Sequence, residues 1–235
     1  MESIFITGST EGLGYLTAKS LIEAGNEVTL HARNQQRADD VSKKLKGAKH
    51  IVIGDLANRE DIESIADQVN SIGTFDTVIY NAGVSTPDTN LTLKVNVEAP
   101  YLLTMLINKP KRIIYVSSGM HKGAKLDIND LSGTTDYSSS KLQVLLLMKI
   151  FAKQFPDTIV TAVDPGWVPT RMGGSMATDD LNMGFSSQVK LATSDDSALT
   201  GSYFYHLKPD RYDSRVDDTD LQQQLLKKLQ EITKR

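Results

Sequence analysis

The chain has 235 residues, of which 40% are hydrophobic, so it can bury a substantial core as one domain. Its formal net charge of -3, with lysines and arginines scattered along the sequence, offers no basic surface for nucleic acid. The absence of cysteine excludes disulfides and thiolate chemistry and gives no indication of export. The apolar run at the amino terminus is too short for a signal peptide or a membrane span. We therefore expect a cytoplasmic protein with no membrane partner and no metal.

Short β-prone runs alternate with helical patterns along the chain. Strands are expected near residues 3–7, 27–31, 49–53, 75–79, 111–116, 158–163 and 202–205. Helices are expected near residues 12–25, 35–46, 58–71, 90–107, 136–155 and 217–233. Such alternation favours an α/β fold, a doubly wound parallel sheet of about seven strands with helices on both faces. No repeat, low-complexity tract or linker divides the chain, so we expect a single domain over residues 1–235.

The first expected strand ends in a glycine-rich turn, Gly8-Ser9-Thr10-Glu11-Gly12-Leu13-Gly14, and a helical pattern follows it. A strand, a glycine turn and a helix are the context that a dinucleotide-binding βαβ unit requires. Glycines let the backbone approach a pyrophosphate, and the helix start directs free N–H groups and its positive dipole end toward the phosphates. Any βα turn can use glycine, so this turn indicates a dinucleotide site only together with other features.

Tyr137 and Lys141 stand four residues apart, before an apolar stretch that favours a helix. On a helix this spacing places the phenol and the ammonium on one face. A phenol titrates near pH ~10, and a neighbouring cation lowers its pKa toward the range that acid–base catalysis needs. An exposed Tyr–Lys pair on an ordinary amphipathic helix would show the same five residues, so the rest of the chain must decide.

The chain resembles the short-chain dehydrogenase/reductase family in its compact single-domain form. The matching motifs, in the family's order, are Thr7-Gly8-x-x-x-Gly12-x-Gly14, Asp55-Leu56, Asn81-Ala82-Gly83, Lys94-Val95-Asn96, Val116-Ser117-Ser118, Tyr137-x-x-x-Lys141 and Pro165-Gly166. The stretch 200–204 with Lys208-Pro209 is similar to the retinol-dehydrogenase-like and carbonyl reductase branch. The resemblance implies a Rossmann fold and an oxidoreductase that interconverts a carbonyl and an alcohol by hydride transfer.

The resemblance also implies the catalytic residues. Tyr137 would act as general acid/base on the substrate oxygen, and Ser118 would hydrogen-bond the same oxygen. Lys141 would lower the pKa of Tyr137 and bind the nicotinamide ribose, and Asn96 would anchor a water that connects Lys141 to solvent. A turn serine and a helix-internal amide are the ordinary alternatives for Ser118 and Asn96. The gap from Asn81 to Asn96 is shorter than the family usually shows, which leaves the placement of Asn96 open.

By the same resemblance, the cofactor contacts come from four loops together with Tyr137 and Lys141. These loop residues are Gly8, Ser9, Thr10, Gly12, Leu13, Gly14, Asp55, Leu56, Asn81, Ala82, Gly83, Pro165, Gly166, Val168 and Thr170. Asp55 would meet the adenine amino group or, alternatively, cap a helix that begins at Asn58. The segment 81–83 would form the floor under the adenine ribose.

NADP is the expected cofactor, and NAD is the less favoured alternative. NAD-binding units place an Asp or Glu about 20 residues past the glycine turn, and residues 31–37 contain no acid. A guanidinium pairs with a 2′-phosphate, so Arg33 is the candidate, with Asn34 and Arg37 as helpers. The two arginines could instead solvate a helix start. Glu11 argues against NADP, because some NADP-preferring relatives carry a base at that position.

Two irregular stretches, near 119–136 and 170–190, follow expected strands and should border the substrate. Methionines, aromatic residues and glycines in the second suggest an adaptable apolar lid, although core packing explains some of them: Trp167, Met172, Gly173, Gly174, Met176, Met183, Gly184 and Phe185. We expect a small hydrophobic carbonyl or alcohol as substrate. His121 is expected to be a surface residue rather than a substrate ligand.

The helix near 136–155 is apolar on most of its circumference from Leu142 to Phe151, more than packing on one side of a sheet needs. We therefore expect a homodimer or tetramer through this helix. The alternative is internal cover by the helix near 217–233, whose stripe holds Leu221, Leu225, Leu226, Leu229 and Ile232. Two other functions also remain open: a non-catalytic dinucleotide-binding sensor, and a partner-binding role for the apolar helix.

Overall fold

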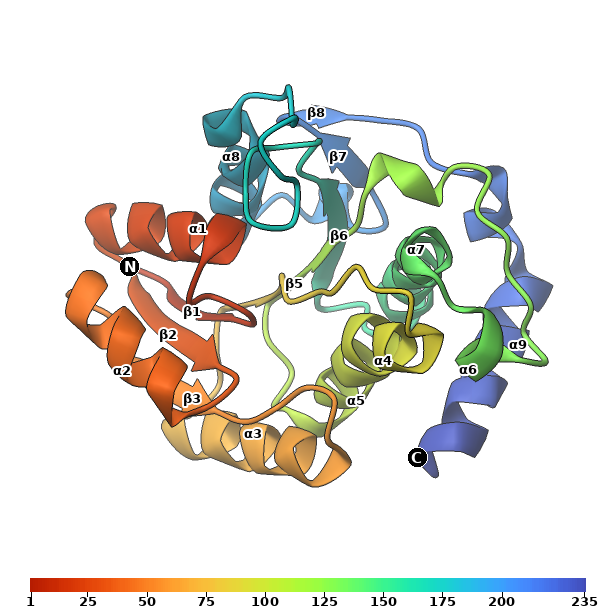
Figure 1. Ribbon diagram of the computed structural model, residues 1–235, viewed down its shortest axis with the longest axis horizontal. Helices are drawn as coiled ribbons and strands as arrows, with labels where there is room; N and C mark the ends of the chain where they lie inside the picture. Colours follow the sequence, from red (N-terminus) through yellow and green to blue (C-terminus); the bar gives the residue numbers. More distant parts are fainter.

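The computed structural model describes all 235 residues. One eight-stranded sheet runs in the order β3-β2-β1-β4-β5-β6-β7-β8 (Figure 1). Its strands are β1 (Ser3–Ile6), β2 (Glu27–Ala32), β3 (His50–Ile53), β4 (Thr77–Tyr80), β5 (Arg112–Val116), β6 (Ile159–Asp164), β7 (Tyr203–Tyr205) and β8 (Lys208–Pro209). All neighbours pair in parallel except β7 and β8, which are antiparallel. The expected doubly wound parallel sheet is confirmed.

The eighth strand was not expected from the sequence. It pairs with β7 through a tight turn in which His206 and Leu207 both have positive φ, 43° and 66°. A two-residue turn of this kind normally uses asparagine or glycine. Because neither residue type is present at these positions, the sequence carries no hairpin signal there.

Nine α-helices surround the sheet, and short 3₁₀ and π turns connect some of them. The helices are α1 (Gly12–Glu23), α2 (Gln35–Lys44), α3 (Arg59–Ile72), α4 (Thr89–Leu93), α5 (Ala99–Leu106), α6 (Leu131–Thr134), α7 (Tyr137–Gln154), α8 (Leu181–Ala192) and α9 (Thr219–Thr233). Side chains that alternate along the strands divide the core into two layers. One layer packs against α1, α2 and α8, and the other against α3, α5 and α7 (Figure 1).

Two helix predictions need correction. The single helix expected over 90–107 is three segments, because a π-helical turn at Lys94–Glu98 separates α4 from α5.

Helix α8 lies where we expected an irregular lid to continue to residue 190. Asp180 caps it by accepting a hydrogen bond from Met183 N at 2.9 Å. Gly184 weakens the helical pattern, yet a Cβ there would come within 2.8 Å of Val168, so close packing requires glycine.

The apolar surface of α7 is covered within the chain. Every residue from Leu142 to Met148 is buried. Helix α9 packs along α7, and Leu225 and Leu229 are fully buried in the same core (Figure 1). Helix α9 of the same chain therefore covers α7, as the alternative interpretation expected. The excess apolar surface on which we based the expected dimer is absent.

Candidate functional site

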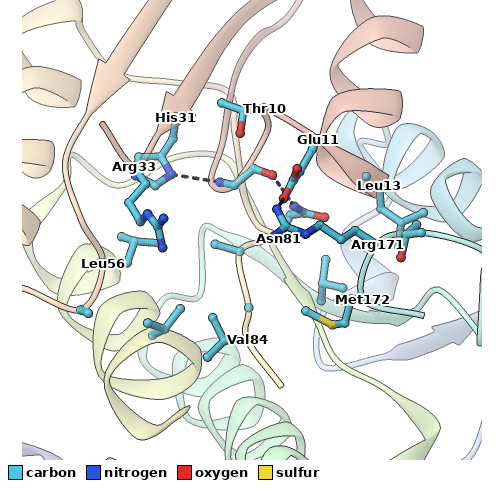
Figure 2. Close-up of a pocket in the computed structure, with 18 of the residues that line it drawn as sticks. Thr10, Glu11, Leu13, His31, Arg33, Leu56, Asn81, Val84, Arg171 and Met172 are labelled. Carbon is cyan, nitrogen blue, oxygen red and sulfur yellow. Dashed lines mark hydrogen bonds and ion pairs between the residues drawn. The ribbon is translucent and has the colours of Figure 1, made fainter. Parts of the chain in front are cut away.

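A cavity of about 650 Å³ opens at the carboxyl ends of the strands, where the strand order reverses between β1 and β4 (Figure 2). Ligands of doubly wound sheets bind at this point. Fifteen of the expected catalytic and cofactor-binding residues line the cavity: Gly8, Thr10, Gly12, Leu13, Arg33, Arg37, Asp55, Leu56, Asn81, Ala82, Gly83, Tyr137, Lys141, Pro165 and Thr170. The remaining expected residues are not part of its lining: Ser9, Gly14, Asn34, Asn96, Ser118, Gly166 and Val168.

The glycine turn is held against the loop after β4. Gly8 has φ of 63°, and a Cβ on it would lie 2.8 Å from Ala82 Cα, so no other residue fits. The Asn81 amide donates hydrogen bonds to the carbonyls of Thr7 and Gly8, both at 3.1 Å. Helix α1 begins at the turn without a side-chain cap, since Glu11 makes no capping bond. The first N–H groups of α1 therefore remain available to an anion.

His31 is a residue of this site that the sequence reasoning missed. It is buried at the end of β2, and its Nδ1 accepts a hydrogen bond from Gly8 N at 3.0 Å (Figure 2). Its Nε2 lies 2.9 Å from the carbonyl of Gly54, to which it donates. Burial lowers the pKa of His31, and the bond to Gly54 and the charge of Asp55 oppose that shift. A neutral imidazole thus fixes the glycine turn.

Charged side chains surround the mouth of the cavity near α2. Arg33 is exposed and forms no ion pair. Arg37 pairs with Glu11 at 2.8 Å, and Arg171, from the loop after β6, lies 3.6 Å from the same carboxylate (Figure 2). Asn34 caps α2 by accepting from Arg37 N at 3.0 Å, so its amide oxygen is already engaged.

Asp55 does not cap the helix that follows β3. Its carboxylate accepts a hydrogen bond from Ala57 N at 2.9 Å, which shapes the loop, while Asn58 itself caps α3. The alternative role considered for Asp55 is therefore wrong. Asp55 and Leu56 both line the cavity.

Tyr137 and Lys141 lie on the first turns of α7, and both face the cavity. Lys141 Nζ is 5.4 Å from the centroid of the Tyr137 ring and donates a hydrogen bond to Val116 O at 2.8 Å. Burial lowers the pKa of Lys141 to about 8, against the attraction of Asp164. Burial also raises the pKa of Tyr137, although a hydrogen bond with Ser118 lowers it in part. The expected depression of the Tyr137 pKa is therefore not found in the structure.

Asn96 lies in the π-helical turn, buried beside Lys141. Its Oδ1 accepts from Val84 N at 2.8 Å, and its Nδ2 donates to Val84 O at 3.0 Å and Ser140 Oγ at 2.9 Å. A Cβ on Gly83 would lie 3.4 Å from Asn96 Oδ1 and 3.5 Å from Lys141 Nζ. The shortened loop therefore still brings Asn96 next to Lys141.

His121 is buried, which corrects the expectation of a surface residue. It follows Ser118 in a short 3₁₀ turn, Gly119–His121, which Ser118 Oγ caps by accepting from Met120 N at 3.3 Å. Apolar cavity-lining residues that the sequence reasoning did not single out are Val84, Leu91 and Val95. They come from the loop after β4 and the helices that follow it.

Comparisons with known proteins agree with this geometry. The chain matches the family model for short chain dehydrogenase over residues 2–181. It is 38% identical to the short-chain dehydrogenase chry4 of Gibberella zeae, over 99% of this chain and 97% of that relative. The chain therefore belongs to the short-chain dehydrogenase family, a family of oxidoreductases that bind nicotinamide dinucleotides.

Solved structures show the same fold at lower identity. An uncharacterized protein from Mycobacterium paratuberculosis superimposes with a TM-score of 0.84 at 23% identity, covering 100% of this chain and 94% of that one. An NADPH-bound carbonyl reductase from chicken fatty liver gives a TM-score of 0.76 at 20% identity, covering 90% of this chain and 99% of that one.

None of the helices combines the length and apolar composition needed to cross a membrane.

Proposed function

We propose that the protein is an NADP(H)-dependent reductase that interconverts a carbonyl and an alcohol, with Tyr137 as general acid/base. The observation that carries this proposal is that Tyr137 and Lys141 line the same cavity as the glycine turn. A proton donor and a dinucleotide-binding turn thus open onto one space, as hydride transfer coupled to proton transfer requires.

The residues present fit a bound dinucleotide. The uncapped start of α1 leaves N–H groups for the pyrophosphate, and the close contact of Gly8 with Ala82 shapes the adjoining wall. Arg33 has no carboxylate partner and suits a 2′-phosphate, and Arg37 stands one turn further along. The NADPH bound to the related chicken reductase points to the same cofactor.

The nicotinamide would supply or accept the hydride when bound. Tyr137 keeps its proton at neutral pH, because a phenol titrates near pH ~10 and burial raises its pKa further. It can therefore donate that proton to a carbonyl oxygen in the reduction direction. Ser118 would donate a hydrogen bond to the same oxygen as negative charge develops on it. Lys141, as a cation beside the phenol, would stabilise the phenolate that forms.

Apolar side chains support a hydrophobic substrate. Val84, Leu91, Val95 and Met172 line the cavity. Met172 and Trp167 are about half exposed, at 52% and 53%, in the loop after β6 that would cover the bound molecule. A small or medium hydrophobic aldehyde or ketone fits this lining better than an anion.

A screen of aldehydes and ketones for NADPH oxidation tests the proposal. We expect turnover with some apolar carbonyls, and loss of turnover in the Tyr137→Phe variant. Protection from thermal unfolding by NADPH, without turnover of any carbonyl or alcohol, would instead favour the sensor function.

A further inference from the structure

The imidazole of His121 is buried between the turn that carries Ser118 and the segment before α9. Its Nδ1 lies 2.6 Å from the carbonyl oxygen of Ser118, and its Nε2 lies 3.2 Å from the backbone N of Asp213. A carbonyl can only accept and an N–H can only donate. Both bonds therefore form only in the neutral tautomer with its proton on Nδ1.

The surroundings of the ring favour that neutral form. Burial lowers the pKa of His121, and the neighbouring charge of Lys122 acts in the same direction, while the bond to Ser118 and the charges of Asp164 and Asp213 oppose it. Tyr203 of β7 packs edge-on against the ring, with 5.2 Å between centroids. The phenol of Tyr203 donates to Asp164 Oδ2 at 3.2 Å, which keeps Tyr203 in place.

The same turn has two further ties to the segment before α9. Gly123 N donates to Asp213 Oδ2 at 3.2 Å, and Lys122 pairs with Asp210 at 3.3 Å. Asp213 is in turn held by Arg215 at 2.7 Å. The Ser118 carbonyl also accepts a hydrogen bond from the backbone N of His121 at 3.1 Å, within the turn. Of the ties between the turn and the segment before α9, only the His121 imidazole also reaches that carbonyl.

We propose that His121 is a positioning residue, which fixes the Ser118 carbonyl through Nδ1–H, while its Nε2 adds one more tie to the segment before α9, beside those of Gly123 and Lys122. This inference rests on the proposed function, in which the Ser118 hydroxyl bonds the substrate oxygen. The carbonyl and the hydroxyl of Ser118 belong to one residue, so rotation of its backbone would move the hydroxyl. A displacement of about 1 Å in such a group can reduce turnover roughly 100-fold.

Two amide substitutions each keep a different one of the two hydrogen bonds that the His121 ring makes. In His121→Asn the side-chain NH₂ takes the place of Nδ1–H and can still donate to the Ser118 carbonyl. In His121→Gln the longer amide reaches the place of Nε2, where its oxygen can accept from Asp213 N. We expect kcat within about threefold of the wild type for His121→Asn and a loss of about tenfold or more for His121→Gln. The Kd for NADPH should stay unchanged in both.

If the role of His121 were purely structural, the kcat values of the variants would follow their thermal stability instead. Equal losses of kcat in the two variants, or losses that follow their melting temperatures, would overturn the inference. So would a folded His121→Asn protein with no turnover.

Hydrogen exchange gives a second readout that does not depend on turnover. Amides of residues 117–124 should exchange at the wild-type rate in His121→Asn and faster in His121→Gln, and equal exchange would contradict the positioning role. If the wild type reduces no carbonyl, the proposed function fails, while the exchange rates still decide whether His121 holds the turn.

Discussion

Lys141 Nζ lies 5.4 Å from the centroid of the Tyr137 ring and donates its hydrogen bond to the Val116 carbonyl rather than to the phenol. Lys141 is buried and Tyr137 is partly buried, and desolvation shifts both toward their neutral forms. The pKa of Tyr137 is raised, and that of Lys141 falls to about 8. The phenol therefore holds a proton that it can donate at neutral pH, and the ammonium is the group that titrates near the working range.

Replacing Tyr137 with phenylalanine removes the proton donor and keeps the ring that packs in the cavity wall. We expect kcat to fall by about 100- to 10,000-fold, the usual contribution of general acid catalysis, with the Kd for NADPH within about twofold. Steady-state kinetics and calorimetric titration measure the two quantities. Activity within a few-fold of the wild type would remove Tyr137 from the role of proton donor.

Lys141→Met should remove activity without lowering stability at pH 7. The pKa of Lys141 is lower in the folded chain than in the unfolded one, so the unfolded state binds the proton more readily and Lys141 disfavours folding below pH 8. The cost is on the order of 3 kcal/mol, partly offset by its bond to Val116. Wild-type stability should rise between pH 8 and about 10, and the variant should lack that rise. Urea unfolding at several pH values measures both, and a variant much less stable than the wild type at pH 7 would refute this account.

Cofactor preference tests Arg33. We expect the wild type to favour NADPH over NADH in kcat/KM, and Arg33→Asp to reverse that preference, because the change removes a phosphate partner and introduces a ribose acceptor. Arg37→Gln serves as the matched control, with a smaller effect, since Glu11 already neutralises Arg37. A wild type that favours NADH would show that Glu11 outweighs Arg33.

Local motifs made much of the cavity predictable from the sequence. The glycine turn and the Tyr137–Lys141 spacing depend on residues that are close together in the chain, and the structure brings them to one cavity. His31 and His121 could not be predicted in this way. The partner of His31 Nδ1 is 23 residues distant and that of His121 Nε2 is 92 residues distant. Tertiary contacts alone define their roles.

The pKa of Tyr137 shows the same limit. The spacing correctly placed a cation near the phenol, but it could not reveal how deeply the helix start is buried. Burial has the larger effect and reverses the direction of the expected shift. Helix α8 was not predicted because Gly184 is typical of a loop. In the structure the glycine lies within the helix, where the absence of a side chain allows close contact with Val168.

His31 should make the protein less stable in mild acid. Its folded-state pKa is depressed by burial, so below the unfolded value of about 6.5 the unfolded chain binds more protons and stability falls with pH. His121 contributes in the same direction. His31→Phe should cost about 2–4 kcal/mol at pH 7, because Gly8 N and Gly54 O lose their partners, and should weaken NADPH binding.

Urea unfolding at pH 7 and pH 5 measures this effect. The His31→Phe variant should lose less stability between the two pH values than the wild type does. The exposed His50 provides the control, since His50→Phe leaves the glycine turn untouched. Equal acid sensitivity in the wild type and His31→Phe would exclude His31 as its source.

Helix α9 should be required for the stability of the chain that carries the site. Leu229 is fully buried in the core that α9 shares with α7, so Leu229→Ala removes apolar contact and leaves a cavity. We expect a loss of about 2–5 kcal/mol in the free energy of unfolding. Ile232, on the same helix and 40% exposed, is the matched control, and Ile232→Ala should cost less than about 1 kcal/mol. Equal losses in the two variants, or none in Leu229→Ala, would mean that α9 does not cover α7 in solution. Light scattering would then show whether a second subunit covers it instead.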